Sequence, residues 1–425
     1  MSEWKKVRLG EVLSIKHGYA FPGEGIVSED NGVVLVTPGN FLIGGGFKES
    51  GKKFFRGDYP SEYQFAGGEL VVTMTDLSKT SDTLGVSAKI PYSKRCVYLH
   101  NQRIGLVTIT DKSADEDFIY WFMRTDQYRK VIVAGASGTT VKHTSPSRIQ
   151  DVELRLPPLP SQRKIAAVLS SLDDKIENNR KICANLEAQA QAIFKSWFVD
   201  FEPFGGKMPQ GWKMGKLGDV ADITMGQSPD GKSLNENGDG TTFFQGRAEF
   251  GNRYPTKRLS TTEPKRMAQE GDVLLSVRAP VGDLNIALEN CCIGRGLAAI
   301  RAKAECVDPD VARPPRPCGK GEGALATSRR CQSFIYCLLQ SMKSQFDLYE
   351  GAGTIFGSIN KDSLHGLSCL VPDEKALQEF EGVVSSFDSL YRERELESRS
   401  LAALRDALLP KLVSGEIDVE KVKVA

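Results

Sequence analysis

The stretch that decides the fold is IAAVLSSLDDKIENNRKICANLEAQAQAIFKSW, which runs from Ile165 to Trp197. Its apolar residues recur at alternating spacings of four and three, beginning with Ile165, Leu169, Leu172 and Ile176. This heptad pattern places an apolar seam along one face of a long helix. The stretch therefore predicts a helix that packs against a second apolar stripe.

The start of this helix is marked by three prolines and a serine. Pro157, Pro158 and Pro160 disfavour helix before this point, and Ser161 is a suitable N-cap. At about 1.5 Å per residue, about forty residues would form a rod roughly 60 Å long. A one-sided rod of that length is not stable alone, so it needs a packing partner.

The second half of the chain supplies that partner, because it repeats the first half. Val168-LSSLD matches Val383-VSSFD at an offset of 215 residues (383 − 168), and Gly138 matches Gly353 at the same offset. Near the N-terminus, Trp4-KKVRLGEV matches Trp212-KMGKLGDV. An ordered set of matches at a constant spacing predicts a duplication of one unit of roughly two hundred residues.

The repeat predicts a second long helix with its own seam. If the two helices pair antiparallel, Asn179 falls near Ser398, and a buried polar pair of this kind fixes the register. The alternative is that each helix packs only on its own globular domain. The predicted seam consists of Leu169, Leu172, Ile176, Asn179, Leu186, Ile193, Phe387, Tyr391, Ser398, Leu401 and Leu408.

The predicted fold class is α+β, a tandem duplication of a mixed α/β domain followed by a long helix, with the two helices forming an antiparallel coiled coil. The predicted parts are a globular domain over 1–157, a central helix over 158–203, a second globular domain over 204–371 and a C-terminal helix over 372–425. An irregular segment over about 305–330 has no counterpart in the first copy. It is either a disordered surface insertion or a reading-frame error, and we assign it no function.

Composition restricts the possible functions. No apolar run approaches the roughly 20 residues that cross a bilayer, and the N-terminal segment lacks the apolar core of a signal peptide. We therefore expect a cytoplasmic protein without a membrane partner. The formal net charge is only +1, so a nucleic-acid binder of this kind must concentrate its Lys and Arg locally.

Catalytic and metal-binding motifs are missing from the sequence. The Pro-Pro pairs at Pro157 and Pro314 lack the amide and the aromatic of an amine methyltransferase motif, and no GxxxxGK[ST] loop occurs. Neither the cysteines nor the four histidines show metal-ligand spacing. The chain is predicted to be no enzyme, although dispersed acids such as Asp76 and Asp272 leave a nuclease open.

The sequence resembles the specificity subunit of type I DNA restriction–modification systems. The resemblance covers nearly the whole chain outside the segment around 305–330, and the shortened proline run at Pro372-Asp373-Glu374 departs from it. The motifs that carry it are Leu156-PPLPSQRKI, Leu172-DDKI, Ala192-IFKSWF, Gly226-QSP, Arg278-APVGD and Leu409-PKLVSGEI.

The resemblance implies two target recognition domains that each read one half of a split double-stranded DNA sequence. It also implies that the helices set the gap between the halves and dock two modification (methyltransferase) subunits, and that restriction/translocase subunits join them. S-adenosylmethionine, ATP and Mg would then belong to those partners, and this chain would hold no cofactor.

The candidate DNA-binding residues lie in polar, Gly-flanked stretches that are typical of loops. They are side chains that suit phosphates or base edges. Arg103 and Arg295 occupy matching places in the repeat, each before an apolar strand. The candidates are Lys52, Lys53, Lys79, Arg103, Thr139, Lys142 and His143 in the first copy, and Gln227, Ser228, Gln245, Arg247, Arg253, Arg278 and Arg295 in the second.

Three functions remain in competition. The first is a non-catalytic, sequence-specific DNA-binding subunit that directs partner enzymes. The second is a stand-alone DNA methyltransferase or nuclease with diverged motifs. The third is an adaptor that binds proteins and never contacts nucleic acid.

Overall fold

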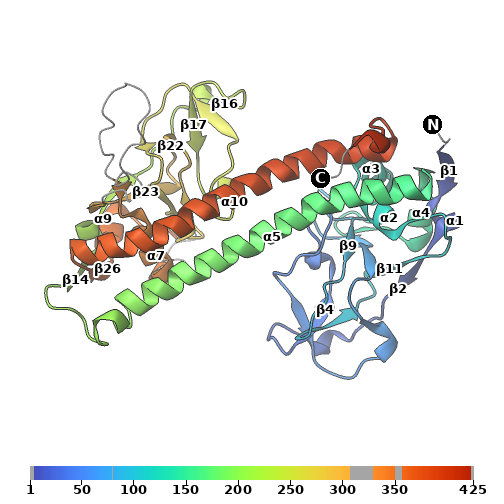
Figure 1. Ribbon diagram of the computed structural model, residues 1–425, viewed down its shortest axis with the longest axis horizontal. Coiled ribbons are helices and arrows are strands. Elements are labelled where there is room, and N and C mark those ends of the chain that lie inside the picture. The colour runs from blue at the N-terminus through green and yellow to red at the C-terminus, as the bar shows by residue number, and fades with distance from the viewer. Residues whose placement is uncertain (1–3, 79, 307–328, 350–356, 423–425) are drawn as a thin grey trace, which may run out of the picture. The chain divides into compact units, whose positions relative to one another are not determined.

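The computed structural model describes residues 4–78, 80–306, 329–349 and 357–422 (Figure 1). Its contacts divide the chain into two compact units, Met1–Asn178 with Glu397–Ala425 (unit 1) and Asn179–Leu396 (unit 2). Each unit holds one globular domain and a part of both long helices. The centre of the irregular segment, 307–328, and the predicted site residue Lys79 lie outside the described residues.

Unit 1 is built on two sheets and two short ladders. The four-stranded sheet has the order β2 (Leu13–His17), β11 (Ile104–Ile109), β7 (Leu70–Thr73), β9 (Ser87–Lys89). The five-stranded sheet has the order β3 (Ile26–Val27), β5 (Lys53–Phe55), β4 (Val33–Val36), β10 (Val97–His100), β6 (Gln64–Phe65). The ladders are β1 (Lys5–Arg8) with β13 (Glu153–Leu156) and β8 (Thr75–Asp76) with β12 (Lys142–His143).

Unit 2 repeats this topology strand for strand in its two sheets. The four-stranded sheet has the order β15 (Ala221–Met225), β23 (Leu297–Ala302), β20 (Val273–Ser276), β21 (Leu284–Ile286). The five-stranded sheet has the order β16 (Leu234–Asn235), β18 (Leu259–Thr261), β17 (Thr241–Phe244), β22 (Cys291–Ile293), β19 (Met267–Ala268). The ladders are β14 (Lys213–Lys216) with β26 (Ser368–Val371) and β24 (Glu305–Cys306) with β25 (Arg329–Arg330). The predicted tandem duplication of a mixed α/β domain is confirmed.

Short helices cover the four-stranded sheet of each unit. The apolar runs at Phe118 and Phe334, predicted to be helical, lie in α2 and α7, and both phenylalanines are buried. The short α-helices are α1 (Leu9–Val12), α2 (Glu116–Phe122), α3 (Asp126–Ala134), α4 (Pro146–Gln150), α6 (Leu217–Val220), α7 (Gln332–Ser341), α8 (Lys343–Asp347) and α9 (Lys361–His365). The 3-10 turns are η1 (Gly23–Gly25), η2 (Pro38–Asn40), η3 (Ser61–Tyr63), η4 (Glu202–Phe204), η5 (Gly231–Ser233), η6 (Arg247–Glu249) and η7 (Val419–Lys421).

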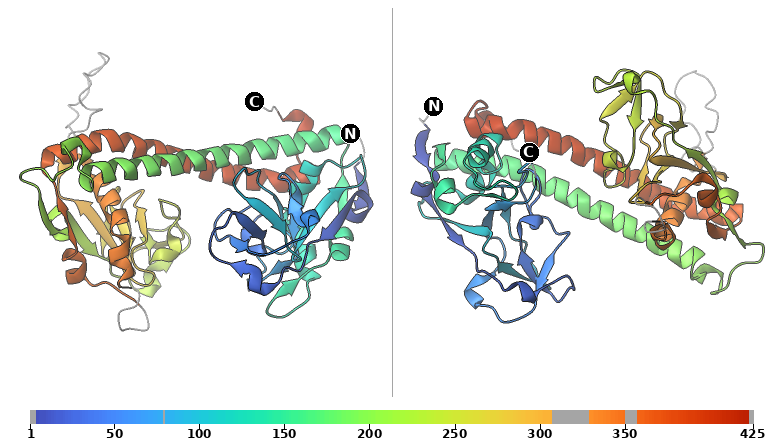
Figure 2. Two further views of the ribbon diagram at one scale, coloured as in Figure 1. Left: turned by 90° about the horizontal axis from the view of Figure 1, so that it is seen from below. Right: turned by 180° about the vertical axis from the view of Figure 1, so that it is seen from behind.

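The two long helices are α5 (Leu159–Phe198) and α10 (Glu374–Ser414). Helix α5 begins two residues before the predicted cap at Ser161. Pro160 is tolerated there because the first turn of a helix leaves its N–H groups unpaired in any case. Within unit 1 the strands and short helices lie against the first part of α5 (Figure 2), where Ile165 and Leu169 are fully buried in the core.

The long helices run antiparallel within each unit. In unit 1, Lys175 of α5 forms an ion pair with Glu397 of α10 at 3.7 Å, and Asp173 pairs with Arg405. In unit 2, the Phe194 and Phe380 ring centroids are 6.1 Å apart, and the Cys183 Sγ donates to the Tyr391 carbonyl at 3.7 Å. In both units, rising residue numbers on α5 meet falling numbers on α10.

The predicted seam residues all turn inward. Each of the eleven is buried or half-buried, and none is exposed. Asn179 is fully buried and belongs to unit 2, whereas Ser398 belongs to unit 1, so their pairing stays a prediction. The helices contact both their own domain and each other, which excludes packing on the domain alone.

A buried arginine joins the domain of unit 1 to α5. Arg124, two residues after α2, donates from Nη1 to Asp173 Oδ2 at 2.7 Å and from Nε to the Gly44 carbonyl at 2.8 Å. Its guanidinium lies over the Trp121 ring, 4.2 Å from the centroid, and the side chain is only 5% exposed. A guanidinium this buried is stable only because each of these contacts compensates the loss of hydration.

Unit 2 has the same kind of contact, a buried arginine paired with an aspartate, at the matching helix position. Asp388, which lies 215 residues after Asp173 (388 − 173), forms an ion pair with Arg253, whose side chain is 3% exposed. The Arg253 guanidinium lies over the rings of Tyr336, at 4.2 Å, and Tyr391, at 4.8 Å. The arginine of each unit therefore packs between aromatic rings and a helix carboxylate.

Replacing Arg124 by Met should remove this contact. Because the change removes one of the two arginine partners of Asp173 (Arg405 stays) and the bond to the Gly44 carbonyl, we expect the free energy of unfolding of unit 1 to fall by about 3 kcal/mol. Hydrogen exchange of β11 amides in the full chain measures this. The control is Lys6→Met, which breaks an exposed ion pair with Glu153 and should cost less than about 1 kcal/mol. Equal losses in the two variants would contradict the assignment.

Glu381 of α10 is a buried acid of unit 2. Burial raises its pKa to about 7, although the Ser333 N–H and hydroxyl bonds to its carboxylate act in the opposite direction. The ordinary pKa of the group is 4.5. Folding therefore favours the protonated carboxyl, and its stabilising effect is complete below about pH 4.5 and is lost as the pH rises through about 7.

The variant Glu381→Gln should remove this pH dependence. For the wild-type chain we expect the free energy of unfolding of unit 2 to fall by about 3 kcal/mol between pH 5 and pH 8 relative to the variant. Hydrogen exchange of β23 amides at several pH values measures it. Glu379→Gln, on the exposed face of the same helix, is the control, and a matching pH profile in both variants would sink the interpretation.

Candidate nucleic-acid interface

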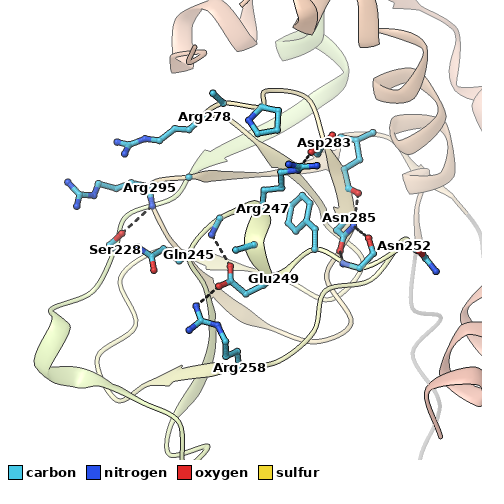
Figure 3. Close-up of a pocket in the computed structure, with 18 residues that line it drawn as sticks. Ser228, Gln245, Arg247, Glu249, Asn252, Arg258, Arg278, Asp283, Asn285 and Arg295 are labelled. Carbon is cyan, nitrogen blue, oxygen red and sulfur yellow. Dashed lines mark hydrogen bonds and ion pairs between the residues drawn. The ribbon is translucent and has the colours of Figure 1, made fainter. Parts of the chain in front are cut away.

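A hollow of about 790 Å³ in unit 2 gathers five of the predicted site residues (Figure 3). They come from loops at the ends of different strands of the two sheets: after β15, β17, β20 and β22. The five are Ser228, Gln245, Arg247, Arg278 and Arg295.

Backbone hydrogen bonds between these loops fix the positions of the Cα atoms that carry the side chains. The Gly294 N–H donates to the Phe244 carbonyl at 2.8 Å, and the Val277 N–H donates to the Gly296 carbonyl at 2.9 Å. A Cβ at Gly294 or Gly296 would lie within 3.0 Å of the Gln245 backbone, so only glycine fits on either side of Arg295. The Gly-Arg-Gly sequence therefore allows the close approach of two loops.

Four arginines line the hollow, and they differ in their partners. Arg247 forms an ion pair with Asp283, and Arg258 donates to the buried Glu249 carboxylate at 2.7 Å. Arg278 and Arg295 are exposed, and within the described ranges their guanidinium groups make no hydrogen bond or ion pair. Two of the four positive charges are thus available to a ligand.

Two predicted residues of unit 2 lie apart from this set. Gln227 is exposed but does not line the hollow. Arg253 is buried in the contact with Asp388 and two tyrosine rings, so its role is in packing. Arg258 was missed by the sequence analysis, because nothing in the Lys257-Arg258 stretch distinguishes it from a surface charge.

In unit 1, three predicted residues, Arg103, Lys142 and His143, lie next to β7 or β8. Lys142 and His143 form β12, which pairs with Asp76 and Thr75, and His143 Nδ1 lies 3.1 Å from Thr75 Oγ1. The Arg103 carbonyl accepts the Met74 N–H at 2.9 Å. Thr139 is exposed in the loop before β12.

The remaining candidates of unit 1 lie on β5 or next to it. Lys52 forms an ion pair with Glu49 and lies over the Tyr98 ring at 5.7 Å, and Lys53 is exposed. Within the part of the chain that the structure describes, no hydrogen bond or ion pair joins either lysine to Arg103 or β12. The contribution of all these residues to DNA binding stays a prediction.

The strand ladders correct the sequence alignment of the two copies by one residue. Ile104 pairs with Thr73 in unit 1, and Leu297 pairs with Ser276 in unit 2, so Ile104 and Leu297 are equivalent. Counting back, Arg295 is matched by Gln102 and not by Arg103. The reason is that the turn bonds to Met74 and Val277, which a sequence alignment cannot see, set the register.

The described residues contain no group of three or more His, Cys, Asp or Glu side chains that could hold a metal ion. Among the helices that the structure describes, none is both long and apolar enough to cross a membrane.

The chain matches the model of the type I restriction modification DNA specificity domain over residues 1–188 and 209–311. A relative from Methanocaldococcus jannaschii, assigned as a type I restriction enzyme MjaX specificity subunit, is 30% identical over 284 residues, or 64% of this chain. That match spans 61% of the relative's own length. The MjaIX specificity subunit of the same organism is 24% identical over 72% of this chain and 70% of its own length.

A solved structure shares the fold. The type I restriction-modification system S subunit from M. genitalium has a TM-score of 0.61 and 16% identity, with 96% of both chains covered. The family model covers more than half of this chain, and it agrees with the family that the sequence motifs predicted. The chain belongs to the family of type I restriction modification DNA specificity domains.

Proposed function

We propose that this chain is the specificity subunit of a type I restriction–modification system and that each unit reads one half of a split DNA target. The single observation that carries the proposal is the repetition of one two-sheet domain whose strand-end loops differ between the copies. A shared framework with different loops suits two half-sites of different sequence.

The chemistry of the hollow in unit 2 suits DNA. Exposed guanidinium groups bind phosphate oxygens, or the O6 and N7 acceptors of guanine, through two parallel hydrogen bonds. Gln245 and Ser228 add neutral donors and acceptors at the same place. Because the net charge of the chain is only +1, the attraction for DNA depends on such local groups.

Partner subunits complete the proposed system. We infer that two modification subunits dock on the long helices and that restriction/translocase subunits join them. S-adenosylmethionine, ATP and Mg would bind to those partners. Since the target is the cell's own DNA, the proposed place of action is the cytoplasm.

A stand-alone methyltransferase or nuclease is the rival proposal, and no observation favours it. Both relatives described above are named specificity subunits. Methylation or cleavage of DNA by the purified chain alone, with a methyl donor and magnesium, would establish the rival.

Selection from randomised DNA duplexes tests the proposal. The full chain, together with modification subunits, should enrich a motif of two short halves separated by a gap of fixed length. If about six phosphates are contacted, the affinity should fall about a thousandfold between 50 and 200 mM salt. The absence of salt-sensitive binding with partners present would favour the protein adaptor instead.

A further inference from the structure

The two units present different side chains at two equivalent places of one framework. Arg278 follows β20 and forms a β-bridge with Ser358, and in unit 1 the equivalent bridge joins Thr75 and His143. The second place holds Arg295 in unit 2 and Gln102 in unit 1, as the ladder register shows. In unit 2 both places lie beside the end of β20, and in unit 1 both lie beside the end of β7.

In unit 2 the two arginines at these places differ from every other arginine of the hollow. Arg247 and Arg258 already have carboxylate partners and would have to break an ion pair to bind a base. The guanidinium groups of Arg278 and Arg295 have no such partner among the described residues. Both residues line the hollow, and their side chains extend to the same side of the view, away from Asp283 and Glu249 (Figure 3). They can bind a ligand without giving up a contact.

The starting point of Arg295 is nevertheless well defined. Its N–H donates to Ser228 Oγ at 3.3 Å, and the glycines on both sides hold the backbone against Gln245. A side chain whose end group is unpaired and whose backbone is held in place discriminates between bases better than a side chain on a mobile loop. Arg278 is rooted in the same way by the bridge to Ser358.

The unit 1 side chains have a different chemistry. Gln102 is exposed, and a glutamine amide pairs with the N6 and N7 atoms of adenine. Thr75, which has the place of Arg278, is only 3% exposed and bonds to His143, which has the place of Ser358. Neither place in unit 1 carries the guanidinium fork that selects guanine.

We propose that these two framework places determine which bases each half of the target contains. Arg278 and Arg295 each read a guanine in the half bound by unit 2, and Gln102 reads an adenine in the half bound by unit 1. This inference rests on the proposed function and assigns the specificity-determining residues within it.

The test is selection from randomised duplexes by the full chain with its modification subunits, comparing wild type with Arg295→Gln. We expect one G·C pair in one half of the motif to be replaced by A·T, with the preference at that position changed by about tenfold or more and the other half unchanged. Arg278→Gln should change a different position of the same half. Arg266→Gln, an exposed arginine of unit 2 outside the hollow, is the control and should leave the motif as it is.

The reciprocal variant Gln102→Arg keeps the test valid if Arg295→Gln does not fold, because it should introduce a guanine into the other half. If the variants weaken binding to all sequences equally and keep the motif, the arginines contact phosphates and the inference is overturned while the proposed function stands. If the wild-type complex enriches no motif, it is the proposed function that fails.

Discussion

A buried arginine held by an aspartate on a long helix is the contact on which the arrangement of each unit depends. Asp173 holds Arg124 in unit 1, and Asp388 holds Arg253 in unit 2. In both units the guanidinium lies against aromatic rings, so the pair couples the apolar core to a charged helix face. Since an unpaired buried charge is costly, this contact strongly favours one position of the domain on its helices.

The two aspartates are repeated in the sequence, but their arginines are not. Arg124 follows α2, whereas Arg253 follows η6, and the two have no common place in the duplicated framework. The aspartate position on the long helix is therefore common to both copies, while the arginine that pairs with it comes from a different part of each domain. The same division holds at the hollow, where strands and turn bonds repeat and the exposed side chains differ. Two half-sites of different sequence require this combination of a repeated backbone framework and different exposed side chains.

Much of the fold could be predicted from the sequence because helical seams and duplications leave periodic signals. The seam through Leu169 and Ile176 and the match of Asp173 to Asp388 needed no structure. The burial of Arg253 could not be predicted, since an arginine in a loop has the same local sequence whether it faces solvent or a carboxylate. The equivalence of Arg295 to Gln102 depends on backbone bonds across the sheet, which a sequence does not record.

The candidate site shows the same limit. Its Gly-flanked loops were recognisable, and five of the seven candidates of the second copy meet in one hollow. Which of its arginines are free depends on Asp283, which lies 36 residues (283 − 247) after its partner Arg247, and on Glu249, which lies nine residues before its partner Arg258.

The central claim is that one chain directs modification to a split target. Mapping methylated adenines in cells that carry the complete system, with and without this gene, tests it most directly. We predict one bipartite motif, with two unlike halves and a fixed gap, that loses its methylation when the gene is removed. Methylation that persists without the gene, or a lost motif that is continuous, would contradict the account.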